Sequence, residues 1–519
     1  MMTRTLPLVI LLASQCLGLK VLLMPMMSGS HILRHGAIGE SLIQRGHESY
    51  MIKHSSIDIP DQLYNSSIHF VNYDTDDQIH FIQTRNFSEI YTTKLVKDPL
   101  SGVKALLEFF DKQCEDLLAN EPLYERLARE RFDFVLVDAF SSLQCFLAYP
   151  RRLGVPYGGV GMLPPTERFT ASLQINYITP TLPHKTFPAK PSLVHRLRQW
   201  LMINIMNTVI EYRQNSDLLR AFLKDKPITH FSQLRDGAQM WLVDMHPILD
   251  VPRPSVPNVI PVGGLTTGPA KSLPDDLQQF ADEADQGLII VAFGTVVTHL
   301  PPEDVVKILN ALNNVTERVV FAMTSPIDAY VRPGIRIMSW IPQNDLLGHP
   351  NTKLFITHCG SCSQHQAVYH AVPMLGIPYQ EEQTYNAQKM FAKGFGDYLD
   401  RHNFRSEDLT KLIRTIIANK TCAATLRTAS QTMRHRLVEP RDEAAYWVDH
   451  VTRYGAAHLT SYTQNLAWYE ILMLDMLGVV AALATALVFI AVLLLKLGRG
   501  VVQTPFWLYH RASWKHKTQ

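Results

Sequence analysis

The stretch that decides the fold is WIPQNDLLGHPNTKLFITHCGSCSQHQAVYHAVPMLGIPYQEEQ, residues 340–383. Within it, the apolar run at 354–357 predicts a buried strand, and Gly360 and Ser361 then open a helix. Residues 374–376 predict the next strand. A strand, a helix and a second strand in this order predict a parallel sheet whose faces are covered by helices. In such sheets ligands bind at the carboxyl ends of the strands, where the polar residues of this stretch fall.

The same alternation extends toward the N-terminus in two series. One series precedes the stretch directly, with strands at 287–293, 318–323 and 335–338 and a helix at 301–313. The other opens the chain, with strands at 20–24, 49–53 and 134–137 and a helix at 31–45. The proline-rich segment 247–266 lies between them and predicts a linker. We therefore expect two doubly wound α/β domains, at 19–246 and 267–470, that face each other across a ligand cleft.

Two terminal segments predict a protein that enters the secretory pathway and stays anchored in the membrane. Residues 1–18 place Arg4 ahead of an apolar run and small residues, which predicts a secretory signal peptide. Residues 476–495 carry no charge, and at ~1.5 Å per residue a helix of this length spans the ~30 Å hydrocarbon core. The tail at 496–519 is basic and has no Asp or Glu, so we expect it in the cytosol and the domains in the lumen.

Smaller signals concern the compartment and the partners. Residues 515–519 resemble a dilysine retrieval signal of the endoplasmic reticulum, and a chance basic tail is the alternative. The chain is therefore expected to be a single-pass type I protein of that membrane. A formal net charge of +2 without a basic tract argues against a nucleic-acid partner. Six cysteines at irregular spacing predict no disulfide framework. Glycosylation sequons begin on the expected lumenal side at Asn65, Asn86, Asn314 and Asn419.

Two polar residues follow neighbouring strands of the N-terminal domain. His31 begins the first helix, directly after the first strand, and a neutral imidazole is a suitable base near pH 7. Asp138 ends the strand at 134–137, so a doubly wound sheet can bring it beside His31. Alone, His31 is more often a solvated residue and Asp138 a helix cap. As a pair they predict acid–base catalysis, because a carboxylate orients the imidazole and stabilises its charged form.

A further strand, at 287–293, runs into Gly294 and Thr295. Such a turn lets backbone N–H groups and a hydroxyl approach phosphate oxygens, although one glycine is weak evidence by itself. The 340–383 stretch is more specific. It closely resembles the signature of the UDP-glycosyltransferases, the family that includes the microsomal UDP-glucuronosyltransferases. The residues that carry the resemblance are Trp340, Gln343, His358, Gly360, Pro373, Pro378, Glu382 and Gln383.

The resemblance covers nearly the whole chain and implies a GT-B fold, two Rossmann-like domains with one C-terminal transmembrane helix. The N-terminal domain would hold the acceptor and the C-terminal domain the UDP-sugar, with no metal or other cofactor. By that similarity, Trp340 stacks on the uracil and Gln343 lies against the base or ribose. Gln366 falls at the ribose position, and Glu382 and Gln383 at the sugar hydroxyls. The diphosphate would be held by Gly294, Thr295, His358, Gly360 and Ser361.

The sequence departs from the family pattern at several of these positions. Gln366 replaces the usual Glu, which weakens a charge-assisted bond to the ribose. Cys359 and Cys362 replace the usual Gly and Asn. Asp244 follows the sequence Trp-Leu-Val at 241–243, where glucuronosyl members often have an Arg thought to face the sugar carboxylate. A carboxylate at that position would repel glucuronate, so a neutral hexose, glucose first, is the favoured donor.

The expected function is inverting transfer of a hexose from a UDP-sugar to a hydroxyl of a small lipophilic acceptor. A catalytically weakened lumenal binding relative is the alternative, because of the departures at Cys359, Cys362 and Gln366. A redox dithiol at Cys359 and Cys362 is disfavoured, since the residues around them match the transferase signature. A cell-surface receptor is disfavoured by the short tail. Whether the chain forms a homo-oligomer is left open.

Overall fold

The computed structural model describes residues 18–26, 29–55, 57, 63, 66–74, 99–138, 145–161, 194, 197, 201, 205, 209, 212, 216–250, 255–295, 297, 299–324, 329–460, 466–471 and 473–515. The chain divides into two compact units. The first comprises Met1–Pro165 and Ile175–Thr460, and the second Thr166–Gln174 and Ser461–Gln519. Each unit is described by itself.

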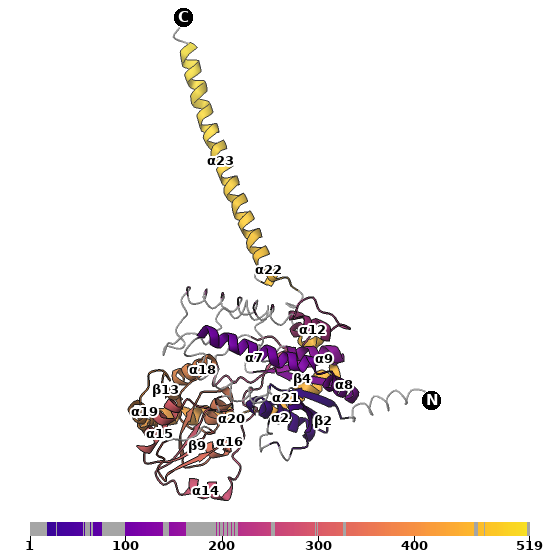
Figure 1. Ribbon diagram of the computed structural model, residues 1–519. Coiled ribbons are helices and arrows are strands. Elements are labelled where there is room, and N and C mark those ends of the chain that lie inside the picture. The colour runs from indigo at the N-terminus through magenta and orange to yellow at the C-terminus, as the bar shows by residue number, and fades with distance from the viewer. Residues whose placement is uncertain are drawn as a thin grey trace, which may run out of the picture. The chain divides into compact units, whose positions relative to one another are not determined.

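The first sheet of the larger unit is parallel, with strand order β3-β2-β1-β4-β5-β6-β7 (Figure 1). Its centre is formed by strands that are buried along almost their whole length, as expected for a sheet covered on both faces. The strands are β1 (Lys20–Met24), β2 (Glu48–His54), β3 (His69–Tyr73), β4 (Phe134–Asp138), β5 (Tyr157–Gly161), β6 (Trp241–Val243) and β7 (Val259–Pro261). The helices of this part are α2 (Gly29–Gln44), α7 (Pro99–Ala119), α8 (Glu121–Glu130), α9 (Ala148–Leu153), α12 (Asp217–Phe222) and α13 (Ser232–Asp236).

The second sheet is also parallel, with order β10-β9-β8-β11-β12-β13. Its strands are β8 (Leu288–Ala292), β9 (Arg318–Ala322), β10 (Ile335–Met338), β11 (Thr352–Thr357), β12 (Met374–Gly376) and β13 (Gly396–Tyr398). Its helices are α14 (Asp275–Asp282), α15 (Pro302–Asn313), α16 (Gln343–Leu347), α17 (Ser361–Tyr369), α18 (Glu381–Ala392), α19 (Ser406–Ala418) and α20 (Lys420–Arg434). The two parallel sheets confirm the prediction of two doubly wound α/β arrangements.

A strand and a helix differ from what the sequence indicated for their segments. β7 falls in the predicted linker and pairs with β6 at the edge of the first sheet, where a strand tolerates Pro261. Helix α21 (Pro440–Tyr454) follows the second sheet in the chain but packs against α2 of the first (Figure 1). Ser41 donates a hydrogen bond of 2.6 Å to Asp442, and Val448 shares a buried cluster with Val21. The predicted domain boundaries therefore stay predictions.

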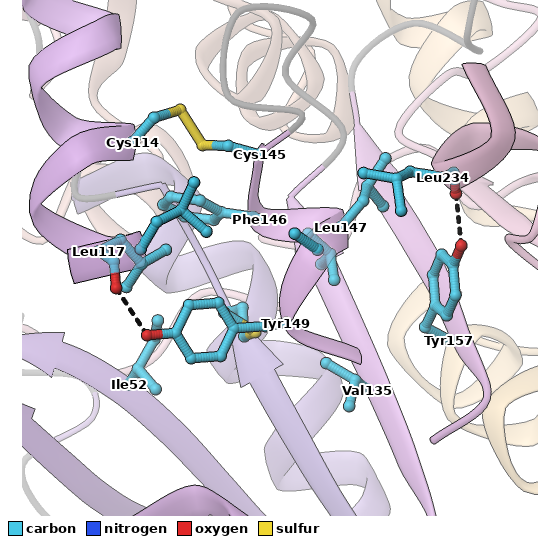
Figure 2. Packing of buried hydrophobic residues seen from close by; sticks show 14 of the residues in the cluster. Ile52, Cys114, Leu117, Val135, Cys145, Phe146, Leu147, Tyr149, Tyr157 and Leu234 are labelled. Carbon is cyan, nitrogen blue, oxygen red and sulfur yellow. Dashed lines mark hydrogen bonds between the residues drawn. A yellow bond between two sulfur atoms is a disulfide. The ribbon is translucent and has the colours of Figure 1, made fainter. Parts of the chain in front are cut away.

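A disulfide joins Cys114 of α7 to Cys145, just ahead of α9. Figure 2 shows this bond at the edge of a buried apolar cluster, with Tyr149 beneath it donating a hydrogen bond of 2.7 Å to the Leu117 carbonyl. The irregular spacing of the cysteines did not predict this bond. It links α7 to the segment just ahead of α9, and bonds of this type are found in proteins of oxidising compartments.

The second unit contains α22 (Trp468–Ile471) and the long helix α23 (Leu474–Lys515). Within α23, residues Leu474–Leu497 have a mean hydropathy of 2.8 and no buried share, so this segment is long and apolar enough to cross a membrane. It includes the whole of the predicted span at 476–495. The predicted signal peptide lies outside the described residues except for Gly18, and the orientation in the membrane stays a prediction.

Candidate active site

The topology of the first sheet brings His31 and Asp138 together. β1 and β4 pair in parallel with Met24 opposite Val137, so both strands end at the same edge. Asp138 is the last residue of β4, and His31 lies in the first turn of α2, which begins shortly after β1. The two side chains are buried, and His31 Nδ1 lies 2.5 Å from Asp138 Oδ2. The contact that the sequence predicted between these two residues is present.

Burial and charge together set the protonation of this pair. Burial favours the protonated form of Asp138, but the charge and hydrogen bond of His31 hold the pKa of this carboxyl well below its usual range. Burial lowers the pKa of His31, Asp138 raises it in part, and the nearby Arg34 lowers it again, so that the net direction is down from 6.5. Near pH 7 the pair is therefore a carboxylate and a neutral imidazole. The carboxylate accepts from Nδ1–H, which leaves the lone pair on Nε2, as a general base requires.

Arg34 is a residue of this site that sequence reasoning missed. It lies on α2 one turn after His31 and only 1% of its side chain is exposed. Its Nη2 is 2.9 Å from His31 Nδ1. The spacing of three residues does place the two on one helix face, but it does not by itself distinguish a cleft-facing Arg from a solvated one.

The predicted phosphate-binding residues gather where β8 and β11 end side by side. Gly294 has a φ of +74°, and a Cβ built on it would lie 2.6 Å from the His358 ring. A Cβ on Gly360 would lie 2.5 Å from Nε2 of the same ring. Both glycines are therefore needed for the backbone to pass close to His358. Burial lowers the pKa of His358 to about 4, so this imidazole is neutral near pH 7.

Helix α17 begins next to this imidazole. Gly360 is its N-cap, Ser361 its first residue, and no side chain of the described residues caps it. The first N–H groups of a helix lack acceptors within the helix and favour an anion. Thr295 lies at the same place and accepts a hydrogen bond of 3.0 Å from the Ser30 N–H at the start of α2. The start of α2, one residue ahead of His31, thus makes a direct contact with the predicted phosphate-binding turn of the second sheet.

The residues predicted at the base and ribose are partly connected. Gln343, the first residue of α16, donates to Gln366 of α17 over 2.7 Å and to Ser363 over 3.2 Å. Gln366 in turn donates to the Thr266 carbonyl over 3.0 Å. Trp340 is half-buried between β10 and α16, close along the chain to Gln343. The Gln366 amide oxygen thus accepts from Gln343, so the side chains predicted at the base and at the ribose contact each other.

The residues predicted at the sugar hydroxyls are engaged in the start of α18. Gln383 Oε1 accepts from the N–H groups of Tyr379 and Gln380, at 2.8 and 3.1 Å, in a capping box. Only the amide nitrogen of Gln383 is left for a ligand. Glu382 accepts from Asn386, and burial raises its pKa. Sequence reasoning could not separate a cap from a sugar ligand here, because both need a polar residue at a helix start.

Asp244 follows β6 and its side chain is held on both oxygens. Oδ1 accepts from the Gly264 N–H over 2.7 Å, and Oδ2 lies 3.8 Å from the Cys362 sulfur. The Cys362 thiol has its pKa raised to about 12, mainly by burial, and burial also raises the pKa of Cys359 far above the usual range. Neither cysteine is disulfide-bonded. Protonated thiols are poor nucleophiles, which argues against the redox interpretation of this pair.

Comparison with known proteins identifies the family. A family model described as "UDP-glucoronosyl and UDP-glucosyl transferase" matches residues 19–504. The chain belongs to this family. UDP-glycosyltransferases with similar sequences include UDP-glucuronosyltransferase 2B14 of Oryctolagus cuniculus, 28% identical over 496 residues, which are 91% of this chain and 92% of the relative. UDP-glucuronosyltransferase 2B15 of Homo sapiens is 27% identical over 493 residues, 89% of this chain and 90% of the relative.

Solved structures of two glycosyl-transferring proteins agree with this chain in fold. The glycotransferase of kitacinnamycin superposes with a TM-score of 0.56 at 16% identity, covering 84% of this chain and 99% of that one. Spinosyn forosaminyltransferase SpnP gives a TM-score of 0.55 at 15% identity, with coverages of 84% and 100%. The fold is therefore GT-B, as the resemblance implied. By family and fold, the chain is a glycosyltransferase that takes its sugar from a UDP-sugar and passes it to a small acceptor.

Proposed function

We propose that this UDP-glycosyltransferase transfers a hexose, with inversion, onto a hydroxyl of a small lipophilic acceptor. The observation that carries the proposal is the 2.5 Å contact between His31 Nδ1 and Asp138 Oδ2. Nε2 of His31 takes the proton of the acceptor hydroxyl, while Asp138 orients the ring and stabilises the imidazolium. The acceptor oxygen bonds to C1 of an α-linked UDP-sugar from the far face as the bond from C1 to the phosphate oxygen breaks. The products are a β-glycoside and UDP.

The donor would be bound by residues of the second sheet. The N–H groups at the start of α17, with Gly360 and Ser361, would donate to the diphosphate that leaves, and the neutral His358 would line the site beside them. Gly294 and Thr295 would close the other side of this site. Trp340, Gln343 and Gln366 would hold the uridine, and the side chains of Glu382 and Gln383 the sugar. We expect the transfer to need no metal, so that turnover survives a chelator.

The choice of sugar would depend on the charge at position 244. A buried carboxylate there disfavours a second carboxylate close by, so glucose is the donor that Asp244 favours over glucuronate. The relatives named above are UDP-glucuronosyltransferases, and a glucuronosyl donor is the second candidate. The active domains would lie in the lumen of the endoplasmic reticulum, with α23 as the anchor.

The test is a donor screen on the membrane-bound full chain. UDP-glucose, UDP-galactose, UDP-glucuronate and UDP-N-acetylglucosamine are each offered with a panel of phenols, steroids and bile acids, and UDP release is measured. The proposal expects release that depends on acceptor and forms a β-linked product with one or more donors. UDP binding without release across the panel would indicate the ligand-binding alternative, and an α-linked product would contradict the inverting mechanism.

A further inference from the structure

The Arg34 side chain is a buried cation whose hydrogen-bonding capacity is mostly unused. It is 1% exposed, and its Nε and Nη1 atoms have no hydrogen-bond partner among the described residues. A buried guanidinium without acceptors is costly, and such groups are normally paired. Burial lowers its pKa, but the negative charges of Cys362, which ionises only at high pH, and of Asp138 and Asp244 more than offset this effect, so the net direction of the pKa is up. Arg34 is therefore charged at any pH at which the protein is folded.

Among the described residues, the hydrogen-bond contact of Arg34 with His31 is lost in the active form of His31. Nη2 of Arg34 lies 2.9 Å from Nδ1, and Asp138 Oδ2 lies 2.5 Å from the same nitrogen. A neutral imidazole nitrogen either carries a proton and donates or has a lone pair and accepts. When Nδ1–H donates to Asp138, it cannot accept from Arg34. The guanidinium then needs another acceptor.

The surroundings of Arg34 point to the donor side of the site. The groups that act on its charge include Cys362, in the first turn of α17, and Glu382, in the first turn of α18. These helix starts are the ones that the proposed function assigns to the diphosphate and the sugar. The neighbouring carboxylates are already engaged, Asp138 by His31, Asp244 by the Gly264 N–H and Glu382 by Asn386. No acceptor for the Arg34 guanidinium is therefore left among the described residues, and a ligand would supply it.

We propose that Arg34 is an oxyanion-binding residue of the transfer site, completed by an oxyanion of the donor. That oxyanion is a phosphate oxygen, present in every UDP-sugar, or the C6 carboxylate of a uronate. A planar guanidinium with two unpartnered nitrogens suits either, because it can form two parallel hydrogen bonds. Binding would also hold Nη2 away from Nδ1 and leave the proton of that nitrogen to Asp138. The inference rests on the proposed function and assigns to Arg34 a contact with the oxyanion of the UDP-sugar.

The test measures the binding of three nucleotides to the full chain in detergent by titration calorimetry. UDP, UDP-glucose and UDP-glucuronate are titrated into the unaltered protein, Arg34→Gln, Arg34→Lys and the control Arg45→Gln. Arg45 lies just beyond α2, is exposed and donates to the Asp442 carbonyl, so the control removes an arginine away from the site. Thermal melting confirms that each variant is folded. Should Arg34→Gln unfold, Arg34→Met, which leaves no buried polar group, replaces it in the same titrations.

The expected result is a loss of at least about tenfold in affinity in Arg34→Gln, a smaller loss in Arg34→Lys and none in Arg45→Gln. An equal loss for all three nucleotides identifies the diphosphate as the oxyanion. A loss confined to UDP-glucuronate identifies the carboxylate and a uronate donor. If folded Arg34→Gln binds all three within twofold of the unaltered protein, the Arg34 inference is overturned while the proposed function stands. If the unaltered protein binds none of them, the proposed function fails and the inference with it.

Discussion

Nδ1 of His31 and Oδ2 of Asp138 lie 2.5 Å apart because the strands that precede them, β1 and β4, are neighbours in one parallel sheet. More than a hundred residues separate the two in the chain, so the contact depends on the strand order and not on local sequence. The sheet holds the carboxylate in place, and the first turn of α2 aims the imidazole at it. This arrangement orients the His31 imidazole as a general base requires.

Replacing His31 with Ala should lower kcat about 10²- to 10⁴-fold, the usual contribution of a general base. UDP affinity should change little, because His31 is not among the residues proposed to bind UDP. Single-turnover rates and calorimetric UDP titrations on the same preparation separate the two effects. Turnover at the unaltered rate in His31→Ala would exclude this imidazole from the reaction.

Replacing Asp138 with Asn should also lower kcat by about 10²-fold or more. The amide of Asn can donate to Nδ1, which favours the tautomer with the proton on Nε2 and so blocks the base. The Met26 N–H contacts the same oxygen, Asp138 Oδ2, at 3.3 Å, so an Asn that donates to Nδ1 gives up that contact. Thermal melting checks that the variant is folded. Turnover is compared across pH 6 to 9, and recovery of the full rate at any pH in that range would be evidence against the tautomer argument.

The acidic limb of the pH profile of kcat/KM should lie below pH 6.5. Burial lowers the pKa of His31 from its ordinary 6.5, and the charge of Arg34 lowers it further. Together these two effects exceed the opposing effect of Asp138, which raises the pKa. The neutral form is the base, so the rate falls only when the pH drops through this lowered pKa. Rates between pH 4.5 and 8 with a donor whose charge is constant would locate the limb. A limb centred above pH 6.5 would contradict the prediction.

Much of this site follows from strand ends that the sequence already marks. Asp138 comes directly after an apolar run and His31 follows another by one short turn, and a parallel sheet brings such positions to one edge. Gly294, His358 and Gly360 are found in the same way, since their strands β8 and β11 are adjacent. The two doubly wound sheets could be predicted because both series of strands and helices alternate strongly. These inferences need only the order of elements, which local periodicity supplies. The GT-B fold was implied by the family resemblance, and the solved structures confirm it.

The remaining features depend on tertiary packing. The helical spacing of Arg34 is compatible with exposure to solvent, and only the folded structure shows that it is buried and that its Nε and Nη1 have no partner among the described residues. Gln383 serves as a cap of α18 as well as a predicted sugar ligand, which one sequence position cannot distinguish. α21 packs on the first sheet although it follows the second, because its apolar face covers α2. Sequence order alone assigns it to the wrong neighbour.

Replacing Asp244 with Arg should raise the use of UDP-glucuronate relative to UDP-glucose. The change removes a buried carboxylate beside the site and adds a cation, and a tenfold change in the ratio of kcat/KM corresponds to about 1.4 kcal/mol. Asp244→Asn is the matched control, because it removes the charge but keeps an oxygen for the Gly264 N–H. It should give a smaller rise in the same direction. An unchanged ratio in both variants would show that position 244 does not select the sugar.

The bond between Cys114 and Cys145 should contribute about 2–4 kcal/mol to the free energy of unfolding, since it closes a loop of 31 residues. Replacing both with Ser should lower the melting temperature, and dithiothreitol should lower that of the unaltered chain but not that of the variant. The bond also tests the topology, because disulfides persist in the lumen and are rare in the cytosol. Thiol labelling in denaturant without reductant should therefore leave both cysteines unmodified in protein made with its N-terminal segment, and modify them in protein made without it. Labelling of both cysteines in each preparation would contradict the lumenal placement of this domain.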